Sequence, residues 1–235
     1  DMKDDLRNVD TLVTVSGGME CAAALLWSLK KGLKPVGVHL FNKNKDFAEA
    51  DLFFAQKQCD LLGVRLIVDE VDLPRSKPIT AVFQWQTACS TLVVANPHIE
   101  WKYCVWGSNS EDSWRQRQGL RYASMIQACE YAGSLDRHGV TMEALTRIPV
   151  NLFPFEFLTK SEIASILLRE NKEVADLIWS CAAYSKIAKV GEKIVNYIPC
   201  GKCSKCIERK SAFTTARNAQ FRIQEGKDYE SSYKD

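Results

Sequence analysis

The sequence predicts an α/β protein: a Rossmann-like open sheet of about five parallel strands, followed by a small C-terminal segment that carries a cysteine cluster. Five short apolar runs are each followed by a helical pattern in a chain of 235 residues. A glycine turn joins the first run to the first helix, and four cysteines gather near the C-terminus. Strands that alternate with helices favour a parallel sheet because each parallel connection needs a crossover helix.

The elements follow one another in regular order. The expected strands cover residues 11–16, 34–41, 64–71, 103–107 and 147–153, and the expected helices cover residues 19–31, 46–62, 79–94, 111–131 and 159–170. Gly32 and Gly63 end the first two helices as C′ glycines. Thr159 and Glu162 have the spacing of a capping box at the start of the last helix. Ligands bind beyond the carboxyl ends of such strands, so the strand-to-helix turns are the informative places.

Composition sets the outer limits. Hydrophobic residues make up 46% of the chain, and the formal net charge is +2. The low net charge argues against a protein that coats nucleic acid without specificity.

No apolar run reaches the roughly 18 residues of a membrane helix, and the acidic start does not resemble a signal peptide. We expect an α/β domain over residues 1–175, a cysteine segment over 176–221 and a polar tail over 222–235.

The turn after the first strand is the first candidate site. Ser16, Gly17 and Gly18 stand between the expected strand and helix, in the stretch VSGGMEC. A glycine turn at a helix N-terminus exposes unpaired N–H groups, which favours the binding of phosphate. The Walker and Rossmann dinucleotide patterns are both absent. The residues alone are compatible with a phosphate site and with a tight turn that holds no ligand.

The cysteine cluster is the second candidate site. Cys181, Cys200, Cys203 and Cys206 give the spacing C-x18-C-x2-C-x2-C. Four thiolates close a tetrahedral zinc site that has a structural role, since no position is left for water. An iron–sulfur cluster and a redox disulfide are the alternatives. We expect zinc that pins the C-terminal segment onto the α/β domain.

The other five cysteines are scattered through apolar stretches. We expect them to behave as small core residues. A single metal cluster among otherwise unpaired cysteines fits a reducing cytosol, so a cytoplasmic protein is expected. These residues are Cys21, Cys59, Cys89, Cys104 and Cys129.

Taken together, the motifs resemble the QueC family, the 7-cyano-7-deazaguanine synthases of the PP-loop ATP pyrophosphatase superfamily. VSGGMEC is similar to the superfamily's SGGxDS loop, and VWGSNSED and PFEFLTKSEI are similar to two further family segments. WSC and CGKCSKCIERKSAF closely match the family's zinc segment. The likeness runs from Ser16 to Phe213. It implies an adenine nucleotide α-hydrolase-like fold and an ATP-dependent carbon–nitrogen ligase that uses ATP, Mg²⁺ and Zn²⁺.

The resemblance also implies roles for single residues. Glu20, at the acidic position of the loop, and Lys160 are the expected catalytic residues. Gly107, Asn109 and Asp112 are expected to bind the substrate. Residues expected to bind ATP and Mg²⁺ lie in the turn and at the end of the second strand: Ser16, Gly17, Gly18, Met19, Glu20, Cys21, Phe41 and Asn42.

Each of these roles has a plainer alternative. Lys160 can be a solvated lysine of the first helical turn, and Asn109 and Asp112 can simply cap the helix that follows. Cys21 can be an ordinary helix residue or, as a further alternative, a nucleophile.

The chemistry implied by the family begins with activation of a 7-deazaguanine carboxylate by ATP. Ammonia then gives an amide, and a second activation gives the nitrile used in queuosine biosynthesis. The chain departs from the family in its Glu20–Cys21 pair and lacks the family's G-Q-R-H-like segment. Of the P-G-R-N-like segment only LPRSKP, with Arg75, is found. QueC-like proteins also occur in anti-phage operons of the type IV CBASS and Qat kinds, where a partner protein would supply the acceptor amine.

Two other functions stay open at this level. One is an ATP-binding relative without catalysis, and Glu20 and Cys21 are the residues in its favour. The other is a PP-loop enzyme that modifies tRNA, although the lysines of the cysteine segment are more typical of a solvated face, so tRNA is not expected as a partner. A homodimer is compatible with the sequence, and no membrane partner is expected.

Overall fold

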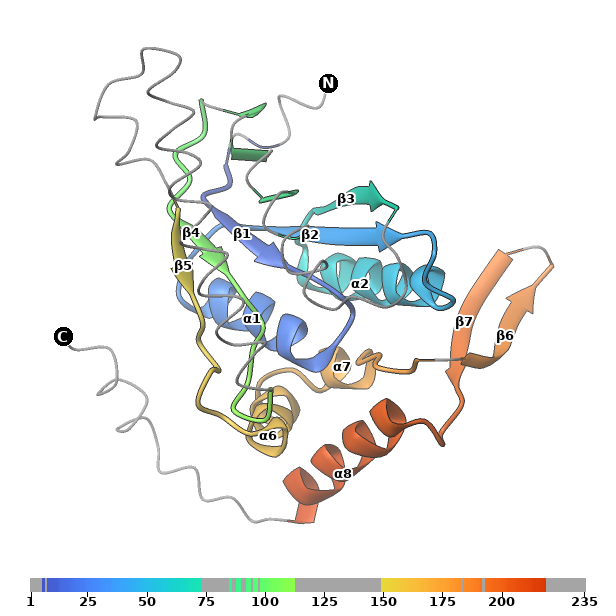
Figure 1. Cartoon of the computed structure of the whole chain (residues 1–235). Helices are drawn as coiled ribbons and strands as arrows, with labels where there is room; N and C mark the ends of the chain where they lie inside the picture. The colour runs from blue at the N-terminus through green and yellow to red at the C-terminus, as the bar shows by residue number, and fades with distance from the viewer. Residues whose placement is uncertain are drawn as a thin grey trace.

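The computed structural model describes residues 6, 8–72, 85, 88–89, 92–93, 95–96, 98–112, 149–182, 184–191 and 193–218. Its centre is a parallel sheet in the order β3-β2-β1-β4-β5 (Figure 1). The strands are β1 (Thr11–Thr14), β2 (Pro35–Asn42), β3 (Leu66–Val71), β4 (Tyr103–Val105) and β5 (Val150–Leu152). The predicted fold class and its five strands are therefore confirmed.

The centre of the sheet is buried on both faces, as parallel sheets usually are, whereas β3 and β5 at the edges are partly exposed. Every residue of β1 is buried. Val13 belongs to an apolar cluster on one face, while Leu12 belongs to a second cluster with Val36 and Val38 of β2. This alternation follows from the two-residue period of a strand. It explains why the strands read as apolar runs and not as alternating polar and apolar residues.

Helices cover the face to which Val13 points. These are α1 (Met19–Lys30), α2 (Ala48–Leu62), α6 (Lys160–Glu170) and the short α7 (Lys172–Asp176) (Figure 1). Gly32 and Gly63 follow α1 and α2 with φ of +72° and +64°, a conformation that glycine adopts at little cost. The predicted capping box is present: Glu162 N donates to Thr159 Oγ1, and Thr159 N donates to Glu162 Oε2.

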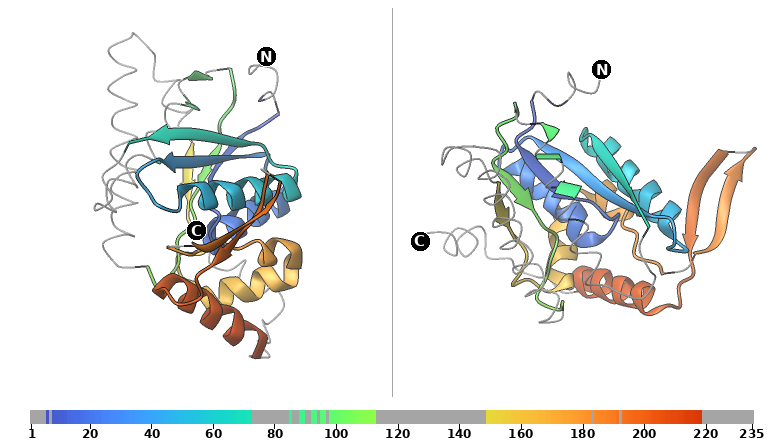
Figure 2. Two further views of the ribbon diagram at one scale, coloured as in Figure 1. Left: turned by 90° about the vertical axis from the view of Figure 1, so that its right-hand side faces the viewer. Right: turned by 45° about the horizontal axis from the view of Figure 1, so that its top comes forward.

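The C-terminal part contains elements that the sequence analysis did not predict. A hairpin of β6 (Tyr184–Val190) and β7 (Lys193–Pro199) lies between Cys181 and Cys200 and projects beside the sheet (Figure 2). Helix α8 (Ser204–Asn218) follows and packs along α6, with Ala212 in the core cluster of the α/β part. The cysteine segment is thus attached to the main domain by packing at α8.

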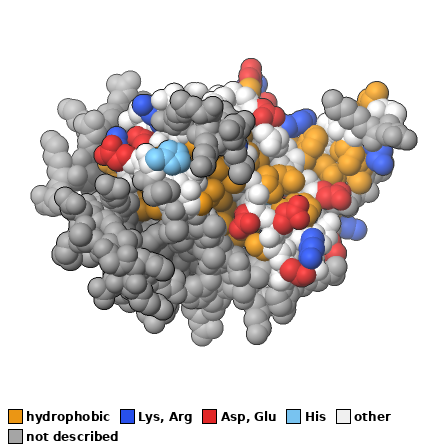
Figure 3. All heavy atoms as spheres, turned by 90° about the horizontal axis from the view of Figure 1, so that it is seen from above, with side chains coloured by type: hydrophobic (Ala, Val, Ile, Leu, Met, Phe, Trp, Pro, Cys, Tyr) orange, Lys and Arg blue, Asp and Glu red, His pale blue; other side chains and the backbone are white. Residues whose placement is uncertain are grey.

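The hairpin carries several exposed apolar side chains. On the face shown in Figure 3, hydrophobic side chains are visible at the end where the hairpin lies, and charged side chains of both signs are interspersed over the described residues. Among the described helices, none is both long and apolar enough to cross a membrane. The exposed apolar residues of the hairpin are Val190, Val195 and Ile198.

Several predicted features lie outside the residues that the structure describes. The expected helices at 79–94 and 111–131 lie largely outside the described residues. So do Cys129, the LPRSKP segment with Arg75, and the tail at 222–235. The division into three segments stays a prediction.

Candidate functional site

The strand order places two predicted site segments next to each other. The chain runs from β1 outward to β2 and β3 on one side, and then crosses to β4 on the other side of β1. The turn after β1 and the segment after β4 therefore leave the sheet at the same edge, from neighbouring strands. Ligands of open α/β sheets bind at such a point of reversal, beyond the carboxyl ends of the strands.

The glycine turn is built by backbone geometry. Gly17 has φ of +81°, and a Cβ atom there would lie 3.0 Å from Asp51 O of α2. Gly18 is the N-cap of α1, and no side chain caps the first turn of this helix. Ser16 Oγ accepts a hydrogen bond from Gly18 N at 3.3 Å. An uncapped helix N-terminus at the edge of a sheet has the donors that an anion needs.

At Gly107, glycine is required because there is no space for a side chain. A Cβ atom at this position would lie 2.8 Å from Cys21 N and 2.8 Å from Glu20 C, both backbone atoms of α1. The end of β4 thus presses directly against the first turn of α1. This close approach allows the residues after Gly107 to reach the side chain of Glu20.

Glu20 and Asn109 are in direct contact. Asn109 Nδ2 donates to Glu20 Oε1 at 2.8 Å, and the Asn109 side chain is buried. Asn109 N donates to Asp112 Oδ2 at 3.0 Å, and Glu111 N donates to Asn109 Oδ1 at 2.8 Å. These last two bonds close a local turn, and the helix that the alternative interpretation has them cap lies outside the described residues. Asn109 therefore both shapes its own turn and holds the carboxylate of Glu20.

Lys160 completes this group from α6. Its side chain is only 18% exposed, and Nζ lies 2.9 Å from Glu208 Oε2 of α8. Burial lowers the pKa of Lys160, but the hydrogen bond with Glu208 and the charges of Glu20 and Asp112 outweigh burial and raise it. Burial raises the pKa of the Glu20 carboxyl, and the Lys160 charge opposes that change. Lys160 is thus a half-buried side chain that is paired with Glu208, and not a fully solvated lysine.

The other residues predicted to bind ATP lie in α1 and at the end of β2. Met19 and Cys21 are buried in the first turn of α1. Cys21 Sγ lies 3.3 Å from Ser16 Oγ, and burial raises the pKa of its thiol, which disfavours the thiolate that a nucleophile needs. Phe41 and Asn42 stand at the carboxyl end of β2, beyond its pairing with β1 and opposite β3. Asn42 Oδ1 accepts a hydrogen bond from Asn44 N at 3.1 Å.

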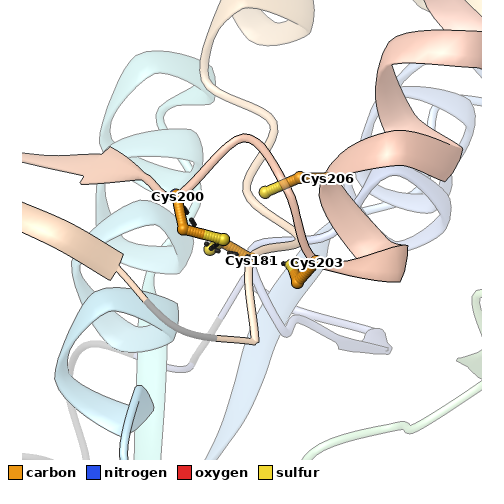
Figure 4. A group of neighbouring side chains, drawn as sticks. All are labelled: Cys181, Cys200, Cys203 and Cys206. Atoms are coloured by element: carbon orange, nitrogen blue, oxygen red, sulfur yellow. Dashed lines mark hydrogen bonds between the residues drawn. The ribbon is translucent and has the colours of Figure 1, made fainter.

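The four predicted cysteines come together in space. Their sulfur atoms all lie within 4.8 Å of one another, and Cys181 Sγ is 3.6 Å from Cys200 Sγ and 4.0 Å from Cys203 Sγ (Figure 4). A hydrogen bond with the backbone of Ala182 is the main cause that lowers the pKa of Cys203 to about 6, which favours the metal-binding thiolate.

This donor set fits one tetrahedral ion. Ligands that share a zinc ion at about 2.3 Å lie roughly 3.8 Å from one another. A cubane iron–sulfur cluster binds each cysteine to a different iron and therefore holds the sulfurs further apart. The sulfur separations, 3.6 Å between Cys181 and Cys200 and no more than 4.8 Å within the group, are compatible with a shared tetrahedral ion. The four cysteines thus form a group that could hold a metal ion.

The cysteine segment also supports the glycine turn. Trp179 N donates to Gly17 O at 2.9 Å, two residues before the first cysteine ligand. The Trp179 ring stacks on Phe54 of α2 with ring centroids 4.8 Å apart. Gln58 Nε2 donates both to Gly17 O, at 2.8 Å, and to Leu177 O, at 3.1 Å. The carbonyl of Gly17 is therefore held from two sides.

Sequence reasoning missed these supporting residues. Trp179 stands in the WSC motif but has no signal that points to Gly17, and Gln58 is one polar residue within an ordinary helix. Glu208 and Arg209 lie in the CIERK stretch, where Arg209 donates to Ile178 O at 3.0 Å. The charge and position of Glu208 could have marked it as a candidate, since it follows the last cysteine ligand by two residues.

His39 and Asp51 are buried near the glycine turn. Their shifted pKa values predict opposite dependences of the free energy of unfolding on pH. The His39 ring bonds Val15 O through Nδ1 at 2.7 Å, and burial lowers the pKa of His39 to about 4. Burial raises the pKa of Asp51 to about 6, although Lys45 opposes it. His39 thus stabilises the fold when neutral, and this contribution is lost as the pH falls from 6.5 through 4. Asp51 stabilises the fold when it is protonated. This contribution to the free energy of unfolding is lost as the pH rises from 3.8 through 6.

We expect the two slopes to offset each other in the native protein between about pH 4 and 6. Chemical denaturation of His39→Gln should show a free energy of unfolding that falls as the pH rises, because the contribution of Asp51 is then no longer offset by His39. Asp51→Asn should show the opposite slope, each slope amounting to about 3 kcal/mol in total. The exposed His98→Gln variant serves as the control and should keep the native profile. Equal profiles for all four proteins would contradict the assignment.

No protein-family model matches the chain, and no curated protein matches it. Solved structures similar to the chain include the following three. The U34-tRNA thiolase NcsA from Methanococcus maripaludis, with its [4Fe-4S] cluster, has a TM-score of 0.46 and 14% identity, over 73% of this chain and 65% of the thiolase.

NMN synthetase from Francisella tularensis has a TM-score of 0.42 and 12% identity, over 91% and 87% of the two chains. NH3-dependent NAD synthetase from Campylobacter jejuni has a TM-score of 0.41 and 16% identity, over 74% and 72%. The chain thus spans just under two thirds of the thiolase. The assignment of the fold rests on the strand order described above.

Proposed function

We propose that the protein is an ATP-dependent ligase of the PP-loop kind that activates a 7-deazaguanine carboxylate and passes it to an amine. The observation that carries this proposal is the convergence of Glu20, Asn109, Asp112 and Lys160 at the uncapped end of α1. A site that adenylates a carboxylate needs donors for phosphate, carboxylates for Mg²⁺ and a cation for the developing charge. The QueC-like motifs of the sequence supply the identity of the substrate.

In the proposed reaction, the substrate carboxylate attacks the α-phosphorus of ATP and pyrophosphate leaves. The amine then attacks the acyl carbon, loses a proton and displaces AMP, which gives an amide. If the amine is ammonia, a second activation of the amide oxygen and loss of AMP give the nitrile. An amine on a partner protein stops the sequence at the amide.

Each residue has a defined part in this scheme. The backbone N–H groups at Gly18 and the first turn of α1 bind the pyrophosphate portion of ATP. Glu20 and Asp112 are the carboxylates available for Mg²⁺, which would neutralise the phosphate charge. Lys160 faces the same edge and stabilises charge on the phosphate or the substrate carboxylate. Zn²⁺ at the four cysteines has a structural role, because four ligands leave no open position.

The direct test is release of pyrophosphate by the purified protein. ATP, Mg²⁺ and 7-carboxy-7-deazaguanine should give release that depends on the acid, and mass spectrometry should identify the adenylate, the amide or the nitrile. Parallel reactions with ammonia, with a lysine-containing peptide and without amine distinguish the acceptors. Tight ATP binding by calorimetry without any acid-dependent release would instead identify a nucleotide-binding protein that has lost catalysis.

Restoration of the family loop gives a sharper expectation. Glu20→Asp should lower the rate of pyrophosphate release about tenfold, because the shorter side chain draws the carboxylate away from Asn109 Nδ2. Cys21→Ser should be tolerated, since a hydroxyl can still bond Ser16 Oγ. Steady-state kinetics of both variants provide the measurement.

The exposed Glu173→Asp variant makes the same shortening away from the site and should leave the rate unchanged. A Glu20→Asp enzyme as fast as the native enzyme would show that the longer carboxylate is not adapted to this site.

A further inference from the structure

Helix α8 brings an acidic side chain into the candidate site that the sequence motifs do not include. Glu208 Oε2 lies 2.9 Å from Lys160 Nζ and 3.4 Å from Lys205 Nζ. Lys160 is 18% exposed, whereas the side chain of Glu208 is 42% exposed. Glu208 is therefore the more exposed member of the ion pair with Lys160.

The position of Glu208 depends on the cysteine cluster. Cys206, two residues earlier, is a predicted metal ligand and is buried. Ser180 Oγ donates to Lys205 O at 3.1 Å, and Arg209 donates to Ile178 O at 3.0 Å. These contacts join the first turns of α8 to the chain just before the first cysteine. These contacts tie the part of α8 that carries Glu208 to the segment that carries the first cysteine.

The backbone of Lys160 is equally constrained. Its N–H donates to Glu111 Oε1 at 3.0 Å, and the preceding Thr159 is held by the capping box. The long side chain remains the adjustable part, and it interacts electrostatically with both Glu20 and Glu208. Of these two carboxylates, Glu208 makes the direct ion pair.

We propose that Glu208 is a positioning residue, which orients the Lys160 ammonium toward the substrate edge and so couples the cysteine cluster to the site. This inference rests on the proposed function, in which Lys160 stabilises charge during transfer. Glu208 acts only through Lys160 and does not touch the reacting atoms. Removal of its side chain leaves Lys160 in place but free to adopt other rotamers.

A double-mutant cycle tests this role. Glu208→Ala should lower kcat about tenfold with a change of less than about threefold in KM for ATP, because orientation matters most in the transition state. In the Lys160→Ala background the same change should have no further effect, since residues that act as a unit are not additive. Glu208→Gln, whose amide oxygen still accepts from Lys160, should recover most of the rate. Lys210→Ala, an exposed change on the same helix, is the control.

Equal losses of kcat from Glu208→Ala in both backgrounds would overturn the proposal. So would a loss of bound metal or of thermal stability in Glu208→Ala that matches the loss of activity, because the effect would then be structural.

A second measurement does not depend on turnover. Acetylation of Lys160 with a water-soluble reagent, followed by peptide mass spectrometry, should be about threefold faster in Glu208→Ala, since the ion pair no longer restrains the amine. Lys210 in the same sample provides the reference rate. Unchanged labelling overturns the positioning role even if the native protein is active. Faster labelling in a protein that releases no pyrophosphate supports the ion pair and contradicts the proposed function instead.

Discussion

Replacement of Cys203 with alanine is expected to remove the bound metal, to lower the melting temperature by about 10 °C and to weaken ATP binding about tenfold. Cys203 lies within the group of four sulfurs, so three ligands remain and the site no longer closes. The loss reaches the glycine turn through Trp179, whose N–H donates to Gly17 O and whose ring stacks on Phe54. Metal analysis, thermal denaturation and calorimetry with ATP measure the three effects.

Cys59→Ala is the matched control. Cys59 is a buried cysteine of α2 that lies outside the cluster. Its truncation should cost about 1–2 kcal/mol through the small cavity it leaves, but it should keep one metal ion per chain and the native affinity for ATP. A Cys203→Ala protein that keeps its metal would contradict the ligand assignment. A protein that loses its metal but binds ATP normally would contradict the link from Trp179 to the turn.

The native protein should contain about one zinc ion per chain and no iron. An iron–sulfur cluster would give a brown protein with visible absorption, which is easily distinguished from colourless zinc. Detection of stoichiometric iron would overturn the assignment of zinc. The proposed function would survive that result, because the cluster has no part in the transfer of the acyl group.

Gly107→Ala is expected to have a comparably large effect by a different route. The new methyl group would lie 2.8 Å from Cys21 N and Glu20 C, so the first turn of α1 must move away from β4. Overpacking against backbone atoms should destabilise the fold by about 3 kcal/mol. The displacement separates Glu20 from Asn109, and pyrophosphate release should fall about a hundredfold.

Gly32→Ala separates crowding from backbone conformation. Gly32 has φ of +72°, but a methyl group at this position would meet nothing within 4 Å, whereas Gly107 is crowded without a positive φ. Gly32→Ala should therefore cost only about 1 kcal/mol, through left-handed strain, and leave activity unchanged. If Gly107→Ala were as mild as Gly32→Ala, the close contact between β4 and α1 would not be essential to the site.

Local patterns in the sequence were enough to predict much of the fold. Each of these predictions depends on residues that are close in sequence. They are the five strands, the two C′ glycines and the capping box at Thr159. The four cysteines were equally visible, because thiolate ligands have few other reasons to occur at this spacing. The hairpin between Cys181 and Cys200 was missed, since its short strands stand between stronger cysteine signals.

The sequence by itself determined which residues are chemically suited to the site: the S-G-G turn, Glu20, Asn109, Lys160 and the cysteines. Only the tertiary structure decided how they are joined. Glu20 meets Asn109 because β4 inserts beside β1, and Lys160 meets Glu208 because α8 packs along α6. Trp179 reaches Gly17 in the same way, across most of the chain. Such contacts leave no trace in a short stretch of sequence, because strand order and helix packing set them and local spacing does not.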